Sequence, residues 1–283
     1  MKASPSLPSL IQRALGPRGY AQQSRARLLL SGSAMSVMGG LLGGTAPLRG
    51  RASLEMIIRP FGYRDAAEFW GIDDPRLALL VHSIVGGTPA YRREFVAGDS
   101  PASLADFDSW VLRTVLNPQL PLFREARYLL AERGDTAGAW RNSQPTFLAQ
   151  VAGPHFETIC RDWAQSGADA FGEAPGEVAA GVVADPLRRG QIQIDAAVFA
   201  PDDPGRPRRV LSLGEAKWDK VMTLGHLERL RRARDLLAVK GYDTTATRLT
   251  CYNAAGFDPE LSDAARNDVG VQLIGLDALY GRH

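Results

Sequence analysis

Two strand-like runs joined by a turn-rich segment constrain the fold of this chain more than any other feature. The first run is 191–200, with the sequence QIQIDAAVFA, and the second is 209–218, with the sequence RVLSLGEAKW. The segment between them, PDDPGRP, is rich in proline, aspartate and glycine. Because two apolar runs separated by such turn residues are typical of a β-hairpin, the sequence predicts two neighbouring antiparallel strands.

Three charged residues lie within this predicted hairpin: Asp195 in the first strand, and Glu215 and Lys217 in the second. Side chains two positions apart on a strand point to the same face, so Glu215 and Lys217 are expected to lie together. A metal-dependent phosphodiesterase needs such groups, because carboxylates bind Mg²⁺ while a lysine stabilises charge or helps to activate water. The competing interpretation is a solvated strand face, since a D…ExK pattern is common by chance.

Composition narrows the classes of protein to which the chain can belong. Its 283 residues suggest one or two domains, and 45% hydrophobic and 23% charged residues are typical of a globular protein. The net charge of +2 gives no global basic field for nucleic acid. Cys160 and Cys251 match no zinc spacing, so a reduced, cytoplasmic location is expected. No apolar run approaches the ~20 residues that span a bilayer, which predicts no membrane partner.

The first half of the chain is predicted to be mainly helical. The expected helices are 7–15, 63–70, 74–84, 104–116 (with Ser103 as N-cap) and 122–131, and the expected strands are 27–33 and 54–58. A polar segment, 132–138, contains two glycines and marks the best domain boundary.

The second half is predicted to be an α/β fold. The expected order is a helix at 146–165, bent or split near Gly153-Pro154, strands at 177–183, 191–200 and 209–218, a helix at 224–240, a strand at 245–253, a short helix at 259–266 and a strand at 271–276. This αβββαβ(α)β order predicts a mixed sheet flanked by helices.

Further polar residues allow more than one interpretation. The arginines of the predicted helix 224–240 could form a solvated face with local ion pairs, or a phosphate-positioning surface beside the acidic cluster; they are Arg229, Arg231, Arg232 and Arg234. His155 and His226 are interpreted as ordinary helix residues, because no recognisable motif places a nucleophile beside them.

The region from about 153 to 283 resembles the PD-(D/E)XK nuclease-like domain. The matching residues are Glu157 on the first helix, Asp195 on the second strand and GEAKW at 214–218 on the third. The resemblance implies a restriction-endonuclease-like core, metal ligation by Asp195 and Glu215, Lys217 at the water and the phosphate, and Glu157 as an additional acid. It also implies Mg²⁺ or Mn²⁺ as cofactor and DNA as substrate. Ile194 stands where this family has its proline.

The first half resembles a prokaryotic or archaeal-type AAA+-like P-loop ATPase family whose members often end in a PD-(D/E)XK-like domain. The matching pieces are LLLSGS at 28–33, SVM at 36–38, APLRGR at 46–51 and PF at 60–61. The resemblance implies a vestigial nucleotide site, with Ser31 or Ser33 as the γ-phosphate sensor and Arg51 near a nucleotide. It also implies three parts: an ATPase-core remnant at 1–60, a helical lid at 61–138 and the nuclease-like domain at 139–283.

Departures from the ATPase pattern limit what the chain is expected to do. It has no GxxxxGK[ST] loop, no strand ending in paired acids and no winged helix between lid and nuclease-like domain, which indicates a truncated member. Phosphate binding in P-loop proteins depends on that loop and its lysine, so we expect no ATP binding by this chain alone. Two functions remain open: a Mg²⁺-dependent DNA endonuclease, or an inert, formerly ATP-regulated module that binds nucleic acid or a partner protein.

Overall fold

The computed structural model describes residues 7–16, 19, 25, 28–32, 46, 48–49, 53–117 and 136–282. The chain divides into two units, Met1–Arg59 and Pro60–His283. Helix α1 (Leu7–Ala14) of the first unit confirms the helix predicted at 7–15. In the described part of the chain, no helix combines the length and the apolar composition that crossing a membrane requires.

Two strands predicted for the first unit are absent from its described residues. Residues 28–32 and 54–58 have no regular secondary structure, and their side chains are exposed, with Leu29 90% and Ile58 86% accessible. A strand exists where its backbone N–H and C=O groups pair with a second strand. In the described part of this unit no second strand pairs with either segment, so apolar composition alone does not make them strands.

The second unit begins with a helical part. It contains α3 (Tyr63–Trp70), α4 (Pro75–Val85), the π-helical segments Tyr91–Phe95, Val111–Val115 and Leu148–Ala152, a 3₁₀ turn (Leu104–Asp106), α5 (Phe107–Trp110) and α6 (Thr136–Phe147). Asp74 caps α4, accepting hydrogen bonds from the backbone N–H groups of Arg76 and Leu77 at 2.8 and 2.9 Å. The predicted helix at 122–131 lies outside the described residues.

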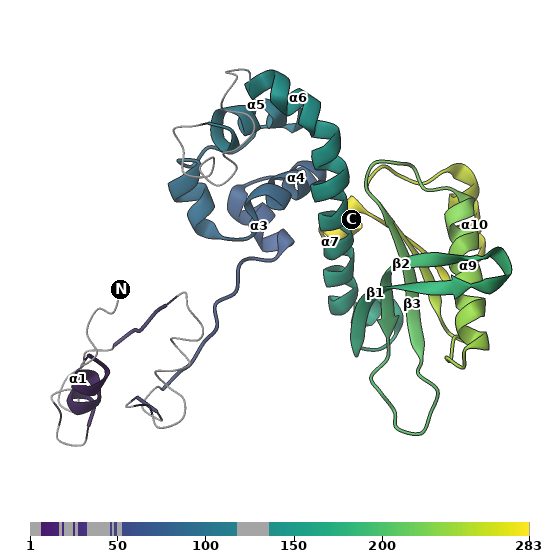
Figure 1. Ribbon diagram of the computed structural model, residues 1–283, viewed down its shortest axis with the longest axis horizontal. Helices are drawn as coiled ribbons and strands as arrows, with labels where there is room; N and C mark the ends of the chain where they lie inside the picture. Colours follow the sequence, from purple (N-terminus) through teal and green to yellow (C-terminus); the bar gives the residue numbers. More distant parts are fainter. Residues whose placement is uncertain are drawn as a thin grey trace. The chain divides into compact units, whose positions relative to one another are not determined.

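A mixed sheet flanked by helices follows, which confirms the predicted α/β class (Figure 1). Its five strands lie in the order β1 (Glu177–Asp185), β2 (Gly190–Phe199), β3 (Val210–Lys217), β4 (Arg248–Asn253) and β5 (Val271–Gly275). The pairs β1–β2 and β2–β3 are antiparallel, so the predicted hairpin is confirmed, whereas β3, β4 and β5 run parallel.

Helices cover both faces of this sheet. Helix α7 (Gly153–Ser166) packs on one face, and α9 (Leu224–Val239) and α10 (Pro259–Asn267) on the other (Figure 1). The short elements are α8 (Ala168–Phe171), the 3₁₀ turn Pro186–Arg188 and α11 (Leu276–Leu279). The helix predicted at 146–165 is split where α7 begins at Gly153.

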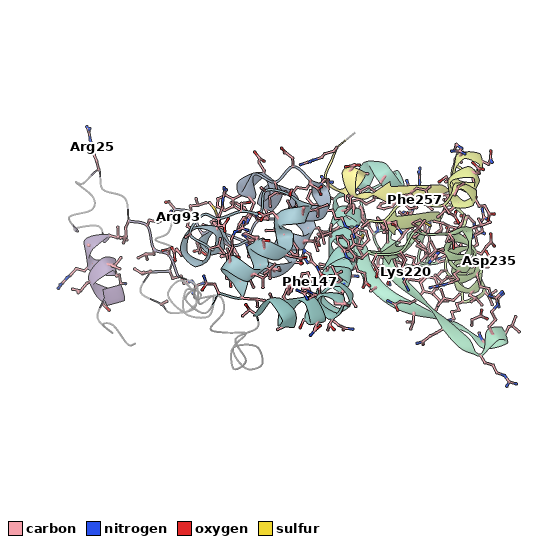
Figure 2. All side chains as sticks on the ribbon, turned by 90° about the horizontal axis from the view of Figure 1, so that it is seen from above. Arg25, Arg93, Phe147, Lys220, Asp235 and Phe257 are labelled. Carbon is pink, nitrogen blue, oxygen red and sulfur yellow. The ribbon has the colours of Figure 1, made fainter. Side chains whose placement is uncertain are left out.

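One hydrophobic core joins the helical part to the sheet. It contains Trp70 and Trp110 of the helical part, Phe156 of α7, and Ala216 and Tyr252 of the sheet. Figure 2 shows the side chains of both parts, with Phe147 labelled in the helical part and Phe257 in the sheet part. The compact unit that begins at Pro60 therefore includes both the segment predicted as a lid and the predicted nuclease-like domain.

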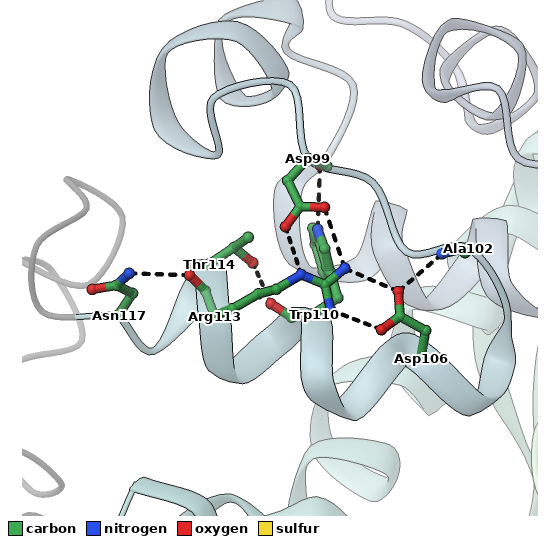
Figure 3. Close-up of polar contacts among 7 residues, drawn as sticks. All are labelled: Asp99, Ala102, Asp106, Trp110, Arg113, Thr114 and Asn117. Carbon is green, nitrogen blue, oxygen red and sulfur yellow. Dashed lines mark hydrogen bonds and ion pairs between the residues drawn. The ribbon is translucent and has the colours of Figure 1, made fainter.

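Arg113 fixes the loop before α5, as Figure 3 shows. Its guanidinium lies 2.7 Å from a carboxylate oxygen of Asp99 and 2.7 Å from one of Asp106. The hydrogen bonds from Arg113 lower the pKa of Asp106 to about 2. Asp106 also accepts the backbone N–H of Ala102. Ser103 occupies the N-cap position, as predicted, with an extended backbone, but its side chain makes no capping hydrogen bond.

Two histidines join the helical part to α7. Nδ1 of His82 on α4 lies 2.8 Å from Nε2 of His155, a hydrogen bond between two imidazoles. Burial lowers the pKa of His82, and burial followed by the charge of His82 lowers the pKa of His155 to about 4. Asp162 of α7 interacts electrostatically with His82, and burial raises the pKa of Asp162 itself.

We predict that stability decreases as pH falls from the ordinary histidine pKa of 6.5 towards about 4. In that window the unfolded chain binds protons that folded His155 does not bind, which favours unfolding. Urea unfolding at several pH values between 4 and 7.5 measures this slope. His155→Gln should be less stable at pH 7 and should have a flatter profile. A variant slope equal to that of the wild type would contradict this assignment.

Candidate functional site

Glu215 is a buried carboxylate held between two cations. Its side chain is 1% exposed, and its Oε1 lies 3.2 Å from Nζ of Lys217 and 3.0 Å from a guanidinium nitrogen of Arg229 on α9. Glu215 and Lys217 therefore share a face, as their spacing predicts. Both cations are within ion-pair distance, yet neither is aligned as a hydrogen bond, and Oε2 has no hydrogen-bond partner. The buried carboxylate keeps acceptor capacity.

A β-bulge in β2 sets the position of Asp195. Ala179 pairs with Ala197, but Gly181 pairs with Ile194, so β2 has one more residue than β1 over this stretch. The consequence appears in the packing: Ala196 joins the core under α7, whereas Ile194 joins the core under α9. In a regular strand these two residues would share a face. A bulge of this kind redirects a side chain, here that of Asp195.

The carboxylate of Asp195 is buried and hydrogen-bonded on both oxygens. Oδ2 accepts the backbone N–H of Ala216 at 2.8 Å, and Oδ1 accepts the side-chain amide of Gln193 at 2.8 Å. Arg161 of α7 donates to the backbone carbonyl of Asp195 at 2.9 Å. The backbone N–H of a strand residue lies in the plane of the sheet. The Asp195 oxygen that accepts the Ala216 N–H therefore lies near this plane, beside the segment from Glu215 to Lys217.

Glu157 lies on α7, and its electrostatic environment links it to the strand residues. Burial, and next the charge of Asp195, raise the pKa of Glu157, whereas Arg161 and Lys217 lower it. Glu157, Asp195 and Lys217 therefore interact electrostatically although they come from three different elements. A raised pKa makes Glu157 a better proton acceptor than an ordinary glutamate.

The acids do not form a complete protein cage for a metal. Among the described residues, no group of three or more His, Cys, Asp and Glu side chains is placed to hold an ion. Glu215 meets α9 through Arg229, whereas Asp195 interacts with Glu157 of α7. The backbone of Ala216 links the two strand acids, because its N–H binds Asp195 and its neighbour in sequence is Glu215.

A cleft lies at the carboxyl ends of the parallel strands, beside the end of β3. It has a volume of about 390 Å³, and its lining includes Arg76 and Asn253. Asn253 ends β4 and is the register partner of Lys217 on β3, but neither Lys217 nor Glu157, Asp195 or Glu215 lines the cleft. The Arg76 guanidinium lies 4.4 Å from the ring centre of Trp218, which is 4% exposed. Trp218 thus belongs to the core edge, and the helical part contributes a cation next to the site.

Other predicted site residues are not brought to this cluster. Ser31 is exposed and lies in a segment without regular structure, in the first unit. Ser33 and Arg51 lie outside the described residues. The predicted nucleotide site therefore stays a prediction from resemblance.

Sequence reasoning missed the specific contribution of Arg229. The sequence predicts a helix that follows the acidic strand, but it does not distinguish among the four arginines of that helix. Which arginine meets Glu215 depends on how α9 crosses the sheet, and no local pattern encodes that angle.

Comparison with known proteins gives no relative. No protein-family model, no curated protein and no solved structure matches this chain. The two resemblances described above therefore rest on their motifs, and the function has to be argued from the site itself.

Gly214 allows the site strand to pass close to Tyr252. A Cβ atom at position 214 would lie 2.6 Å from the Tyr252 ring and 3.2 Å from the backbone oxygen of Ala196. Tyr252 is fully buried and cannot move aside.

We predict that Gly214→Ala destabilises the protein by roughly 1–3 kcal/mol, as overpacking typically does. Gly181→Ala in β1, where a Cβ meets nothing within 4 Å, is the matched control for urea unfolding. Equal stability of both variants would contradict the close approach.

Proposed function

We propose that this site hydrolyses phosphodiester bonds of DNA with the help of Mg²⁺ or Mn²⁺. The observation that carries the proposal is the buried Glu215 carboxylate, whose Oε2 has no partner and whose Oε1 contacts Lys217. Asp195 stands one strand away and binds the backbone between these two residues. A buried charge with unused acceptor capacity is costly unless a ligand or partner uses it.

The chemical type of the donors supports a magnesium ion as the cofactor. Carboxylate oxygens are the hard ligands that Mg²⁺ prefers, and it is usually bound by one or two carboxylates together with waters and substrate phosphates. Glu215 and Asp195 would supply those carboxylates. Each Asp195 oxygen accepts one hydrogen bond from the protein, and a carboxylate oxygen can accept about two.

The residues of the site would have different roles in the reaction. A bound metal ion would polarise the phosphate and acidify a water. Lys217, whose side chain is 34% exposed, can contact a phosphate oxygen while its neighbour Glu215 stays buried. Its charge would offset the negative charge that develops on the phosphate in the transition state. Glu157, with its raised pKa, would accept a proton nearby.

We predict that the purified chain cleaves DNA when Mg²⁺ or Mn²⁺ is present, and that Asp195→Asn abolishes cleavage by weakening metal binding. Lys217→Ala should retain metal binding but lose about 100-fold or more in rate, because its interaction strengthens in the transition state. Lys240→Ala, at the C-terminal end of α9, is the matched control and should cleave normally. Plasmid, single-stranded and branched DNA, each with varied metals, are the substrates to compare. Cleavage at one rate by wild type and Asp195→Asn would overturn the proposal.

A second function is favoured by the pairing already present at the site. Both oxygens of Asp195 accept hydrogen bonds and Glu215 contacts two cations, so the cluster can also persist as an internal ion-pair network. The chain would then be a module that binds nucleic acid or a partner protein without cleaving it. DNA binding that is independent of metal, together with no cleavage of any substrate, would favour this alternative.

A further inference from the structure

The four arginines of α9 differ in their partners. Arg231 pairs with Glu228 at 2.7 Å and with Asp268 at 3.3 Å. Arg232 holds Asp185 of β1 at 2.7 Å. Arg234 pairs with Asp235, which is labelled in Figure 2.

Arg229 instead contacts Glu215, inside the candidate site. Of the two interpretations of this arginine run, ion pairing therefore describes Arg231, Arg232 and Arg234. Arg229 alone among these four arginines meets an acid of the proposed catalytic cluster.

Around Glu215 the cations outnumber the carboxylates. Lys217 and Arg229 both contact its Oε1, whereas Asp195 interacts with Glu157 on the α7 side. A divalent cation entering alone would therefore increase an excess of positive charge in a partly buried site. A phosphodiester carries one negative charge per phosphate and would offset part of that excess. Charge balance thus favours binding of the metal and the phosphate together.

We propose that Arg229 makes metal binding at this site dependent on a bound phosphodiester. Its guanidinium shares Oε1 of Glu215 with Lys217, so it repels a metal ion and competes with it for that carboxylate. A phosphodiester offers the guanidinium a different acceptor, and its arrival releases Glu215 for the metal. The proposal deepens the proposed function and rests on it.

Geometry and chemistry suit Arg229 to this exchange. Its side chain is 46% exposed, so it reaches solvent while it touches a carboxylate that is 1% exposed. The planar guanidinium binds carboxylates and phosphates with the same fork of N–H donors. Linkage requires the effect to be reciprocal: if phosphodiester tightens metal binding by some factor, metal tightens phosphodiester binding by the same factor.

The test is the Mn²⁺ affinity of the full chain, measured by titration with electron paramagnetic resonance detection of free Mn²⁺. Each protein is titrated with and without dimethyl phosphate, a small phosphodiester that resists hydrolysis. For wild type we expect dimethyl phosphate to tighten Mn²⁺ binding by roughly 5-fold or more, the lower end of typical couplings between sites. Arg229→Gln should bind Mn²⁺ several-fold more tightly without phosphodiester, and the coupling factor should fall towards one.

The matched control is Arg231→Gln, the same substitution two positions along α9, where the arginine pairs with Glu228 and Asp268. It should reproduce both wild-type affinities. Arg229→Lys keeps the charge without the fork and should show an intermediate coupling factor. Urea unfolding of each variant verifies that it is folded under the titration conditions.

Failures of the two proposals are distinguishable. If Asp195→Asn weakens Mn²⁺ binding but Arg229→Gln leaves the affinity and the coupling unchanged, the metal site stands and the role of Arg229 is wrong. If wild type and Asp195→Asn bind Mn²⁺ equally, or wild type binds none in either condition, both proposals are overturned. Looser Mn²⁺ binding by Arg229→Gln without phosphodiester would also contradict the competition.

Discussion

The burial of the Glu215 carboxylate is the constraint around which the site is arranged. Removing a carboxylate from water costs several kcal/mol unless charged partners and hydrogen bonds compensate. Here the compensation comes from one residue of the same strand, Lys217, and one of the helix that follows it, Arg229. The packing of helix α9 against strand β3 matters for this reason, because another register would remove Arg229 and leave Lys217 alone beside the charge.

The bulge in β2 solves a related problem for Asp195. In a regular ladder the N–H of Ala216 would be expected to find a backbone acceptor on β2, and the Asp195 side chain would follow the alternation of the strand. The extra residue replaces that acceptor with the Asp195 carboxylate. One local irregularity thus satisfies a buried donor, anchors the acid and turns it towards Glu157. Arg161 secures the same point from α7.

Much of the sheet and part of the site could be predicted from the sequence. The shared face of Glu215 and Lys217 follows from the two-residue period of a strand, and the turn-rich segment 201–207 specified the antiparallel pair. The bulge could not be predicted, because QIQIDAAVFA reads as a regular strand. The partner of Arg229 could not be predicted either, since it depends on the crossing of a helix over a sheet.

The failures in the first half have a different cause. Residues 28–32 and 54–58 have the apolar composition of buried strands, but composition does not supply a neighbour with which to pair. The segment 104–116 has helical periodicity, yet it divides into a 3₁₀ turn, a short α-helix and a π-helical segment. Arg113, in the π-helical segment, pairs with Asp99 and Asp106, contacts that sequence periodicity does not predict.

Stability alone gives little reason for charges at this position. Replacing a buried ion pair with apolar residues of similar volume is often neutral or stabilising, because desolvation offsets much of the electrostatic attraction. Glu215 nevertheless lies at the end of a strand whose preceding residues, Val210 to Leu213, are buried, next to two cations that remain partly exposed. The buried Asp185 is also paired with a partly exposed arginine, Arg232, so a buried acid beside exposed cations is not in itself unusual. The two acids differ in their hydrogen bonds: Arg232 donates two to Asp185, each of 2.7 Å, whereas the Glu215 oxygens receive no aligned hydrogen bond. Glu215 therefore keeps unused acceptors and Asp185 does not, and this difference sets the Glu215 cluster apart from an ordinary ion pair.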